Sequence, residues 1–181
     1  MVIRVIGSEI DIGRLRFDFI GWCETVKGRP LEEVVAEHGL SGHVRVESPL
    51  MKTETFRRLA QSGLLLLLAE DLTLQVPSKA YEYLRAGRPV LALAPREGAV
   101  ADLFATTGGG RVVDPTDSAG IEAVLREAYL GWSDGRDVRL PDQEAVSRFE
   151  RAELTGQLAK VLDGMRPPSG RAGRSRRRSG T

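Results

Sequence analysis

The amino-acid sequence predicts an α/β fold: a Rossmann-like domain of three layers built on a mostly parallel sheet. From residue 15 to residue 117, short β-branched or leucine-rich runs alternate with segments of helical period, as expected for parallel strands joined by helices. The run at 64–69 is apolar at every position, which is typical of a strand buried on both faces in the middle of such a sheet. Proline and glycine mark the ends of several helical segments.

The first half of the chain contains three of the expected strands, at 15–20, 43–47 and 64–69. Pro30 and Gly39 enclose the first helix, because proline suits the first helical turn and glycine the position just past the end. A second helix is expected at 53–61, with Gly63 as a left-handed cap. The side chains that this second helix is expected to bury are Phe56, Leu59 and Ala60.

The second half repeats the pattern with strands at 90–94 and 111–113 and helices at 78–86 and 99–105. A further helix is expected after Asp117, because its apolar residues follow one helical stripe, and a last long helix is expected at 142–163. The stripe after Asp117 consists of Ile121, Val124, Leu125 and Ala128. The apolar positions of the last helix are Val146, Phe149, Leu154, Leu158, Val161 and Leu162.

The chain is expected to hold one main domain, because 181 residues suffice for one ordinary core. We assign residues 1–14 to an irregular or edge-strand segment, 15–164 to the Rossmann-like domain, and 165–181 to a disordered arginine-rich tail. The charge is unevenly distributed. The net charge is +1, and residues 166–181 contain six arginines and no acid, so the remainder carries −5. The tail is interpreted as a solvated terminus, with contact to RNA or anionic lipid left open.

Composition excludes several classes of protein. One cysteine, Cys23, cannot form an internal disulfide, and with His38 and His43 as the only histidines no metal-ligand spacing is present. No apolar run approaches the roughly 20 residues of a spanning helix, and the N-terminus lacks the pattern of a secretory signal. We therefore expect a cytoplasmic protein without a transmembrane segment or a metal, with peripheral contact at the membrane left open.

The segment 76–92 has the features of an anion site. It joins the apolar run at 64–69 to a helix, and helix N-termini beyond the carboxyl ends of parallel strands direct free N–H groups toward ligands. Ser78 can cap or donate there, Lys79 brings a positive charge, and Glu82 follows on the same face. An exposed Lys79–Glu82 ion pair without function is the alternative.

Residues 77–90 read P-S-K-A-Y-E-Y-L-R-A-G-R-P-V and resemble the donor-site signature P-x-K-x-x-E-Y-x-x-x-G-R-P-V of the family 4 (group 1) glycosyltransferases. The similarity extends over about residues 15–162 and includes 19–21, 40–46, 60–68 and 110–117. It implies one half of a GT-B fold, the half that binds the nucleotide-sugar donor. Glycosyl transfer would then proceed without a metal, with helix amides and basic side chains stabilising the departing phosphate.

The resemblance also implies residue roles. Glu82 would bind the ribose, Lys79 and the amides around Ser78 would face the diphosphate, and the segment from Ser48 to Leu50 would flank the base. It leaves the catalytic residues unassigned and implies no cofactor besides the donor substrate. The donor-binding residues expected from it are Gly21, Ser48, Pro49, Pro77, Ser78, Lys79 and Glu82.

The sequence departs from the family in two places. Leu74 stands where the family has a second glutamate, eight positions before Glu82. The strand, glycine loop and helix that normally open this domain are missing, as is the acceptor domain. The segment 2–6 can pair only as a hairpin or an edge, because 7–14 is too short for a parallel crossover. We expect little or no transfer by this chain alone.

Several readings therefore stay open. The chain is a truncated product or one half of a split enzyme, and the sheet region left exposed would meet a separate acceptor domain or a second copy. A non-catalytic module that binds a nucleotide or a partner is the alternative function. A nucleic-acid module acting through the tail is disfavoured, because the rest of the chain is acidic and such binding needs many cation contacts.

Overall fold

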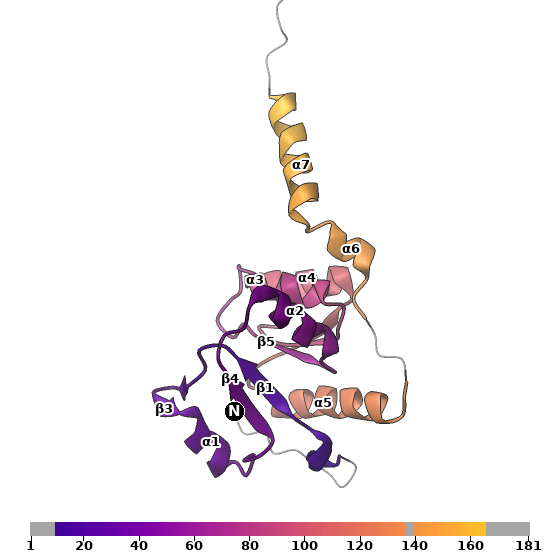
Figure 1. Cartoon of the computed structure of the whole chain (residues 1–181). Coiled ribbons are helices and arrows are strands. Elements are labelled where there is room, and N and C mark those ends of the chain that lie inside the picture. Colours follow the sequence, from indigo (N-terminus) through magenta and orange to yellow (C-terminus); the bar gives the residue numbers. More distant parts are fainter. Residues whose placement is uncertain (1–9, 137–139, 166–181) are drawn as a thin grey trace, which may run out of the picture. The chain divides into compact units, whose positions relative to one another are not determined.

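The computed structural model describes residues 10–136 and 140–165, and it divides the chain into two compact units, 1–146 and 147–181. The first unit contains every strand of the described chain, and the second contains one helix (Figure 1). The expected strand at 2–6 and nearly all of the arginine-rich tail lie outside the described residues.

The strands form two separate parallel sheets and one short hairpin. In the first sheet β1 pairs with β4, with Phe17 opposite Val44. In the second, β6 lies between β5 and β7, with Leu91 opposite both Leu66 and Arg111. The strands are β1 (Phe17–Ile20), β2 (Thr25–Val26), β3 (Arg29–Pro30), β4 (Val44–Glu47), β5 (Leu65–Leu68), β6 (Val90–Leu93) and β7 (Gly110–Val113).

Helices follow most of the parallel strands, as in a Rossmann-like fold. All five predicted strands are present, so the α/β class and the parallel pairing are confirmed, although within residues 10–136 and 140–165 the single sheet expected from the sequence is divided in two. The helices are η1 (Ile12–Arg14, a 3-10 turn), α1 (Leu31–Glu37), α2 (Lys52–Gln61), α3 (Ser78–Arg85), α4 (Ala99–Thr107), α5 (Ser118–Ser133), α6 (Gln143–Ser147) and α7 (Arg151–Gly164).

The hairpin of β2 and β3 was not predicted. Its turn residues Lys27 and Gly28 both have positive φ, of 51° and 77°, as the primed turns that suit the twist of hairpin strands require. Each strand has only two residues, both exposed, so no alternation of apolar side chains marks it in the sequence.

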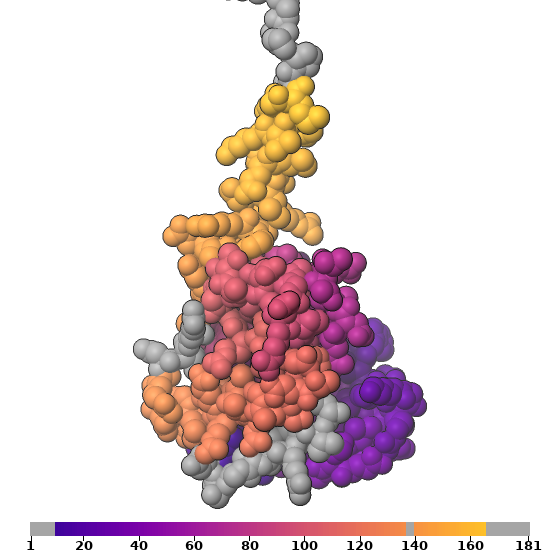
Figure 2. Space-filling model, turned by 180° about the vertical axis from the view of Figure 1, so that it is seen from behind, coloured from indigo at the N-terminus to yellow at the C-terminus, as the bar shows by residue number. Residues whose placement is uncertain are grey.

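The sheet β5-β6-β7 has helices on both faces. On one face α5 packs against β6 and β7, and on the other α3 and α4 lie so close that a Cβ on Gly109 would strike Leu84 and one on Gly110 would strike Phe104. Figure 2 shows the unit from behind, with α4 and α5 at the surface. The core on the α5 face consists of Leu91, Leu93, Val113, Ile121 and Val124. The predicted stripe on the helix after Asp117 therefore faces the sheet, with Leu125 and Ala128 partly buried beside it.

The prediction that 64–69 is a central strand buried on both faces is wrong. Among the described residues β5 is hydrogen-bonded to β6 on one edge only, and its burial alternates: Leu65 and Leu67 are buried, whereas Leu66 is 36% and Leu68 55% exposed. The exposed pair lies on the face that α5 covers over β6 and β7. An apolar run therefore identified a strand here without giving its place in the sheet.

Two predictions about the second helix are also wrong. Phe56 and Leu59 are only partly buried and Ala60 is exposed, because α2 buries none of its residues fully. Gly63 is not a left-handed cap: α2 ends at Gln61, and its C-cap is Ser62, whose backbone is extended, at φ −74° and ψ 144°.

The predicted last helix at 142–163 is two helices, α6 and α7. They are separated by a turn at 148–150, and Glu150 begins α7 from an extended backbone conformation. No proline or glycine stands in this turn, so the helical spacing of apolar residues continues through the break and conceals it.

Candidate functional site

The predicted donor-binding residues follow the carboxyl ends of three parallel strands. Gly21 follows β1, Ser48 and Pro49 follow β4, and the loop 69–77 leads from β5 to α3. β1 and β4 form one parallel sheet, and β5, β6 and β7 form the other. In open parallel sheets, ligands bind beyond the carboxyl ends of the strands.

Gly21 joins the ends of β1 and β4. Its N–H donates to the carbonyl oxygen of Glu47 at 2.9 Å, which extends the ladder of the sheet by one bond. Its φ of +130° then turns the chain away in a conformation that residues with a Cβ rarely adopt. Gly21 and the exposed Ser48 are therefore brought to the same end of this sheet.

The N-terminus of α3 is open. Pro77 is the N-cap, with φ −59° and ψ 140°, and no side chain forms a cap hydrogen bond there. Ser78 is thus the first residue of the helix, and the expectation that its hydroxyl caps α3 is wrong. The N–H groups of a first helical turn lack partners within the helix. Here the Ala80 N–H donates to the Pro77 carbonyl oxygen at 2.9 Å, and no cap side chain occupies the N–H groups of Ser78 and Lys79.

Lys79 and Glu82 lie three residues apart on α3, yet they do not pair. Among the described residues neither side chain takes part in an ion pair, with Lys79 exposed and Glu82 partly buried. The alternative that the two form a surface salt bridge is therefore wrong in this structure. A cation in the first turn of α3 and a carboxylate just beyond that turn therefore remain available near the open helix end.

The loop after β1 comes close to α3. Burial raises the pKa of the Tyr83 phenol, and the neighbouring charges of Glu82 and Cys23 raise this pKa further. A charge effect from Cys23 requires the segment just after Gly21 to lie near α3. The structure therefore places the loop that follows Gly21 near the predicted residues on α3.

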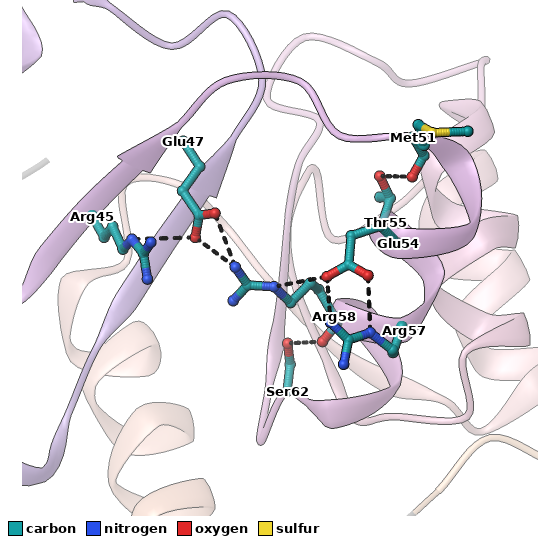
Figure 3. Close-up of polar contacts among 8 residues, drawn as sticks. All are labelled: Arg45, Glu47, Met51, Glu54, Thr55, Arg57, Arg58 and Ser62. Atoms are coloured by element: carbon teal, nitrogen blue, oxygen red, sulfur yellow. Dashed lines mark hydrogen bonds and ion pairs between the residues drawn. The ribbon is translucent and has the colours of Figure 1, made fainter.

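A polar cluster that the sequence did not reveal as important supports the end of β4. Arg58 of α2 donates to both carboxylate oxygens of Glu47, at 2.9 and 3.0 Å, and Arg45 approaches the same carboxylate at 3.3 Å (Figure 3). Arg58 also approaches Glu54 at 3.5 Å. The sequence signals were the shared strand face of Arg45 and Glu47 and the helical spacing of Glu54 and Arg58. The cluster fixes the residue that directly precedes Ser48.

Two hollows lie away from the predicted residues. One, of about 240 Å³, lies between α1 and β4, and the other, of about 420 Å³, lies between α4 and β7. None of the seven predicted donor-binding residues lines either of them. The first is lined by Leu31, Glu32, Val35, Ser41, Gly42, Val44 and Val46. The second is lined by Arg96, Ala101, Asp102, Phe104, Ala105, Gly108, Gly110, Arg111 and Val112.

Comparison of the sequence with models of protein families gives no match, and comparison with curated proteins gives no significant match. Within residues 10–136 and 140–165 no group of three or more His, Cys, Asp or Glu side chains is placed to hold a metal ion. No helix in this described part is long and apolar enough to cross a membrane.

Proposed function

We propose that the chain binds a nucleoside-diphosphate sugar as the donor-binding half of a GT-B glycosyltransferase of the family 4 type. The observation that carries the proposal is the N-terminus of α3, which has no side-chain cap. Lys79 lies in its first turn and Glu82 directly after that turn, and neither forms an ion pair among the described residues. This helix follows the carboxyl end of a parallel strand, where phosphate groups commonly bind.

The proposal assigns the diphosphate to the start of α3. Free N–H groups and the helix dipole favour an anion there, and the dipole by itself disfavours a cation in the same turn. Lys79 is exposed in this turn and no carboxylate pairs with it in the described chain. A bound diphosphate would neutralise both the lysine and the helix end, and helix amides would stabilise the charge that develops on the departing phosphate.

The proposal assigns the ribose to Glu82. An ionised carboxylate accepts hydrogen bonds only, and two adjacent hydroxyl groups can donate to its two oxygens. Glu82 is partly buried next to Tyr83, which is itself close to the loop after Gly21. Ser48 and Pro49 would flank the base from the end of β4, where Arg58 fixes Glu47.

Transfer would require a second domain. In the described part of the chain the residues of the proposed site are exposed or only partly buried, and such a site neither excludes water nor positions an acceptor. We therefore propose donor binding with little or no glycosyl transfer by this chain alone, and transfer only when an acceptor-binding domain is present.

Calorimetric titration with UDP, GDP and ADP and their sugar conjugates tests donor binding. For whichever nucleotide binds, the titration is repeated with its 2′,3′-dideoxy analogue and with Glu82→Ala. The intact chain should prefer the ribonucleotide, and Glu82→Ala should reduce this preference by roughly tenfold, the size expected for hydrogen bonds to a charged group. Lys79→Ala should weaken both nucleotides equally.

The matched control is Glu122→Ala, which removes an exposed carboxylate from α5 on the other side of the sheet. It should leave both affinities unchanged, and thermal unfolding should show that the variants are folded. A preference for ribose that survives in Glu82→Ala would remove that residue from the site. Absence of binding to all three nucleotides would reject the proposed function.

A further inference from the structure

Strand β7 is the last strand of the sheet β5-β6-β7 in the described part of the chain. The carbonyl oxygens of Gly109 and Val113 accept hydrogen bonds, each at 3.1 Å, from the first residue of β6 and from the residue directly after it. Because the backbone groups of a strand point alternately to its two sides, Gly110 and Val112 direct their N–H and C=O groups away from β6. Among the described residues no other group bonds to them.

The hollow of about 420 Å³ between α4 and β7 lies along this edge. Gly110 and Val112 line it together with Phe104 and Ala105 of α4. Gly110 faces α4, since a Cβ there would strike Phe104, and Val112 faces α4 as well because side chains alternate along a strand. Backbone groups that are available for pairing therefore lie next to an apolar space that can hold side chains.

The charged residues of the hollow favour an acidic partner. The charged residues that line it are Arg96, Arg111 and Asp102. Arg111 points toward α5, where it donates to Glu127 at 3.2 Å, and these two side chains are 62% and 70% exposed. Arg96 pairs in a similar way with Asp117. Such exposed ion pairs contribute little to stability, and a guanidinium has five N–H donors, so each arginine can bind a further carboxylate.

We propose that β7 pairs with an extended peptide segment of a partner protein, which adds a strand to the sheet and places side chains in the hollow. Residues of the peptide opposite Gly110 and Val112 face the hollow and should be apolar. The residue opposite Arg111 faces the other side of the sheet and should be acidic. The partner segment therefore has the pattern apolar–acidic–apolar. This inference is independent of the donor site on α3.

The charge of Arg111 also disfavours pairing of β7 with a second copy of this chain. In the antiparallel register that joins Gly110 of one copy to Val112 of the other, Arg111 lies opposite its own counterpart. Like charges directly opposite each other destabilise a pair of strands, whereas opposite charges stabilise it. The edge therefore suits a peptide of different sequence that has an acidic residue at this position.

Fluorescence polarisation of labelled peptides with the full-length chain tests the charge. One peptide is Ser-Thr-Val-Glu-Val-Thr-Ser, and the other has lysine in place of the glutamate. The intact chain should bind the glutamate peptide roughly fivefold more tightly, because attraction replaces repulsion across the pair of strands. Arg111→Glu should reverse this preference. The matched control, Arg57→Glu, alters an equally exposed and ion-paired arginine on α2 and should leave the preference unchanged.

Val112→Pro tests the pairing of the backbone. The Val112 N–H points away from β6, so proline should preserve the pairing of β6 with β7, as prolines on edge strands do, while it removes an outward donor. It should weaken binding of the glutamate peptide roughly tenfold, the upper size for loss of one hydrogen bond. In the unaltered chain the peptide should slow hydrogen exchange of the Gly110 and Val112 amides, a readout that requires no variant.

Ala105→Phe tests the hollow. The exposed Ala105 lines the hollow, so a ring at this position should occupy the space that the apolar side chains of the peptide need. It should weaken binding of the glutamate peptide roughly tenfold, because about one apolar side chain then stays in water. Thr106→Phe is the matched control, because Thr106 is the next exposed residue of α4 and does not line the hollow. It should leave the affinity unchanged.

Several results would overturn the proposal. Absence of binding by both peptides, or the same preference in Arg111→Glu and the unaltered chain, removes an acidic peptide as the partner. Unchanged hydrogen exchange at Gly110 and Val112 when the peptide is bound places the peptide elsewhere, as does full affinity in Ala105→Phe. A dimer in light scattering that Val112→Pro converts to a monomer, without peptide binding, assigns the edge to a second copy.

Discussion

Strands β5 and β6 lie side by side in one sheet and differ little in composition, yet they differ in burial. β6 is Val-Leu-Ala-Leu and all four side chains are buried, whereas β5 is four leucines and every second one is exposed. β6 has a strand on each edge and helices over both faces. β5 has a strand on one edge, and α5 does not cover its Leu66 and Leu68.

The difference shows that burial of a strand is set by its neighbours and not by its own hydrophobicity. A run of leucines indicates that both faces of a strand can be buried. Whether each face is buried depends on which other segments pack against it. Two exposed leucines beside a backbone edge that no described strand pairs with form a surface that sheets usually protect. The two strands therefore provide matched positions at which to measure how much packing of α5 over the sheet contributes to the free energy of unfolding.

Leucine-to-alanine substitutions on the same face should give the largest contrast. Leu93 of β6 and Leu68 of β5 are directly paired in the sheet, but Leu93 is fully buried and Leu68 is 55% exposed. Leu93→Ala should lower the free energy of unfolding by about 3 kcal/mol, because it removes buried methyl groups and leaves a cavity. Leu68→Ala should cost about 0.5 kcal/mol or less, as measured by urea unfolding.

The comparison of β5 and β6 would be contradicted if the two substitutions lowered the free energy of unfolding by the same amount. An equal cost would mean that Leu68 is covered in solution by another segment or another molecule. Repeating the unfolding of Leu68→Ala over a range of protein concentrations separates these two cases, because cover by a second copy makes the cost depend on concentration.

A methyl group added at the start of β7 should have the next largest effect. A Cβ on Gly110 would strike the Val90 carbonyl oxygen and the ring of Phe104, so the pairing of β6 with β7 or the packing of α4 must shift. Gly110→Ala should cost about 2 kcal/mol, the usual range for overpacking being about 1–3 kcal/mol. Gly63→Ala, beside β5, meets no atom within 4 Å and should be neutral or slightly stabilising.

The elements that the sequence predicted well are those with local signals. Pro30 and Gly39 do enclose α1, and Gly87 and Gly108 follow the ends of α3 and α4 with φ of 67° and 64°. These residues act through their own backbone preferences, which a sequence displays directly. The position of β5 at the edge of its sheet and the break between α6 and α7 at 148–150 depend on segments that are neighbours in space. No residue type at those positions predicts either feature.

The candidate site follows the same division. The sequence located α3 and placed Lys79 and Glu82 on it, but whether they pair depends on side-chain conformations that spacing alone does not fix. The sequence predicts that Ser78 can cap the helix or donate through its hydroxyl, whereas Pro77 is the N-cap of α3 and no side chain forms a cap hydrogen bond. The bond from Arg58 to Glu47 joins α2 to β4 through two residues that are 11 positions apart, and only the folded chain brings them together.

A change at the N-cap of α5 should have a smaller effect on stability, and it tests the packing of α5 over β6. Asp117 accepts a hydrogen bond from the Gly120 N–H at 2.9 Å and pairs with Arg96 at 2.5 Å. Asp117→Ala should cost about 1 kcal/mol, the usual value for loss of a cap, and it should loosen α5 without affecting β5. Asp117→Asn keeps the cap oxygen and should recover most of the loss. Hydrogen exchange of the α5 amides measures the local effect, and equal loosening of β5 would contradict it.

The turn between β7 and α5 should give the smallest effect, visible as a shift in titration. The hydroxyl of Thr116 donates to Asp114 at 2.5 Å and the Thr116 N–H donates to the same oxygen at 2.8 Å, and these bonds lower the pKa of the Asp114 carboxyl below its usual value. A lowered pKa in the folded state stabilises the fold above the unfolded value, about 3.9, and this contribution is lost as the pH falls through the folded value. Thr116→Val removes the stronger of the two causes, so the pKa of Asp114 should rise toward its ordinary value in an NMR titration of the carboxyl carbon. The stability of Thr116→Val should then change less than that of the unaltered chain as the pH falls below about 4.

An unchanged pKa of Asp114 in Thr116→Val would contradict this prediction, because it would show that the hydroxyl of Thr116 does not lower the pKa of that carboxyl.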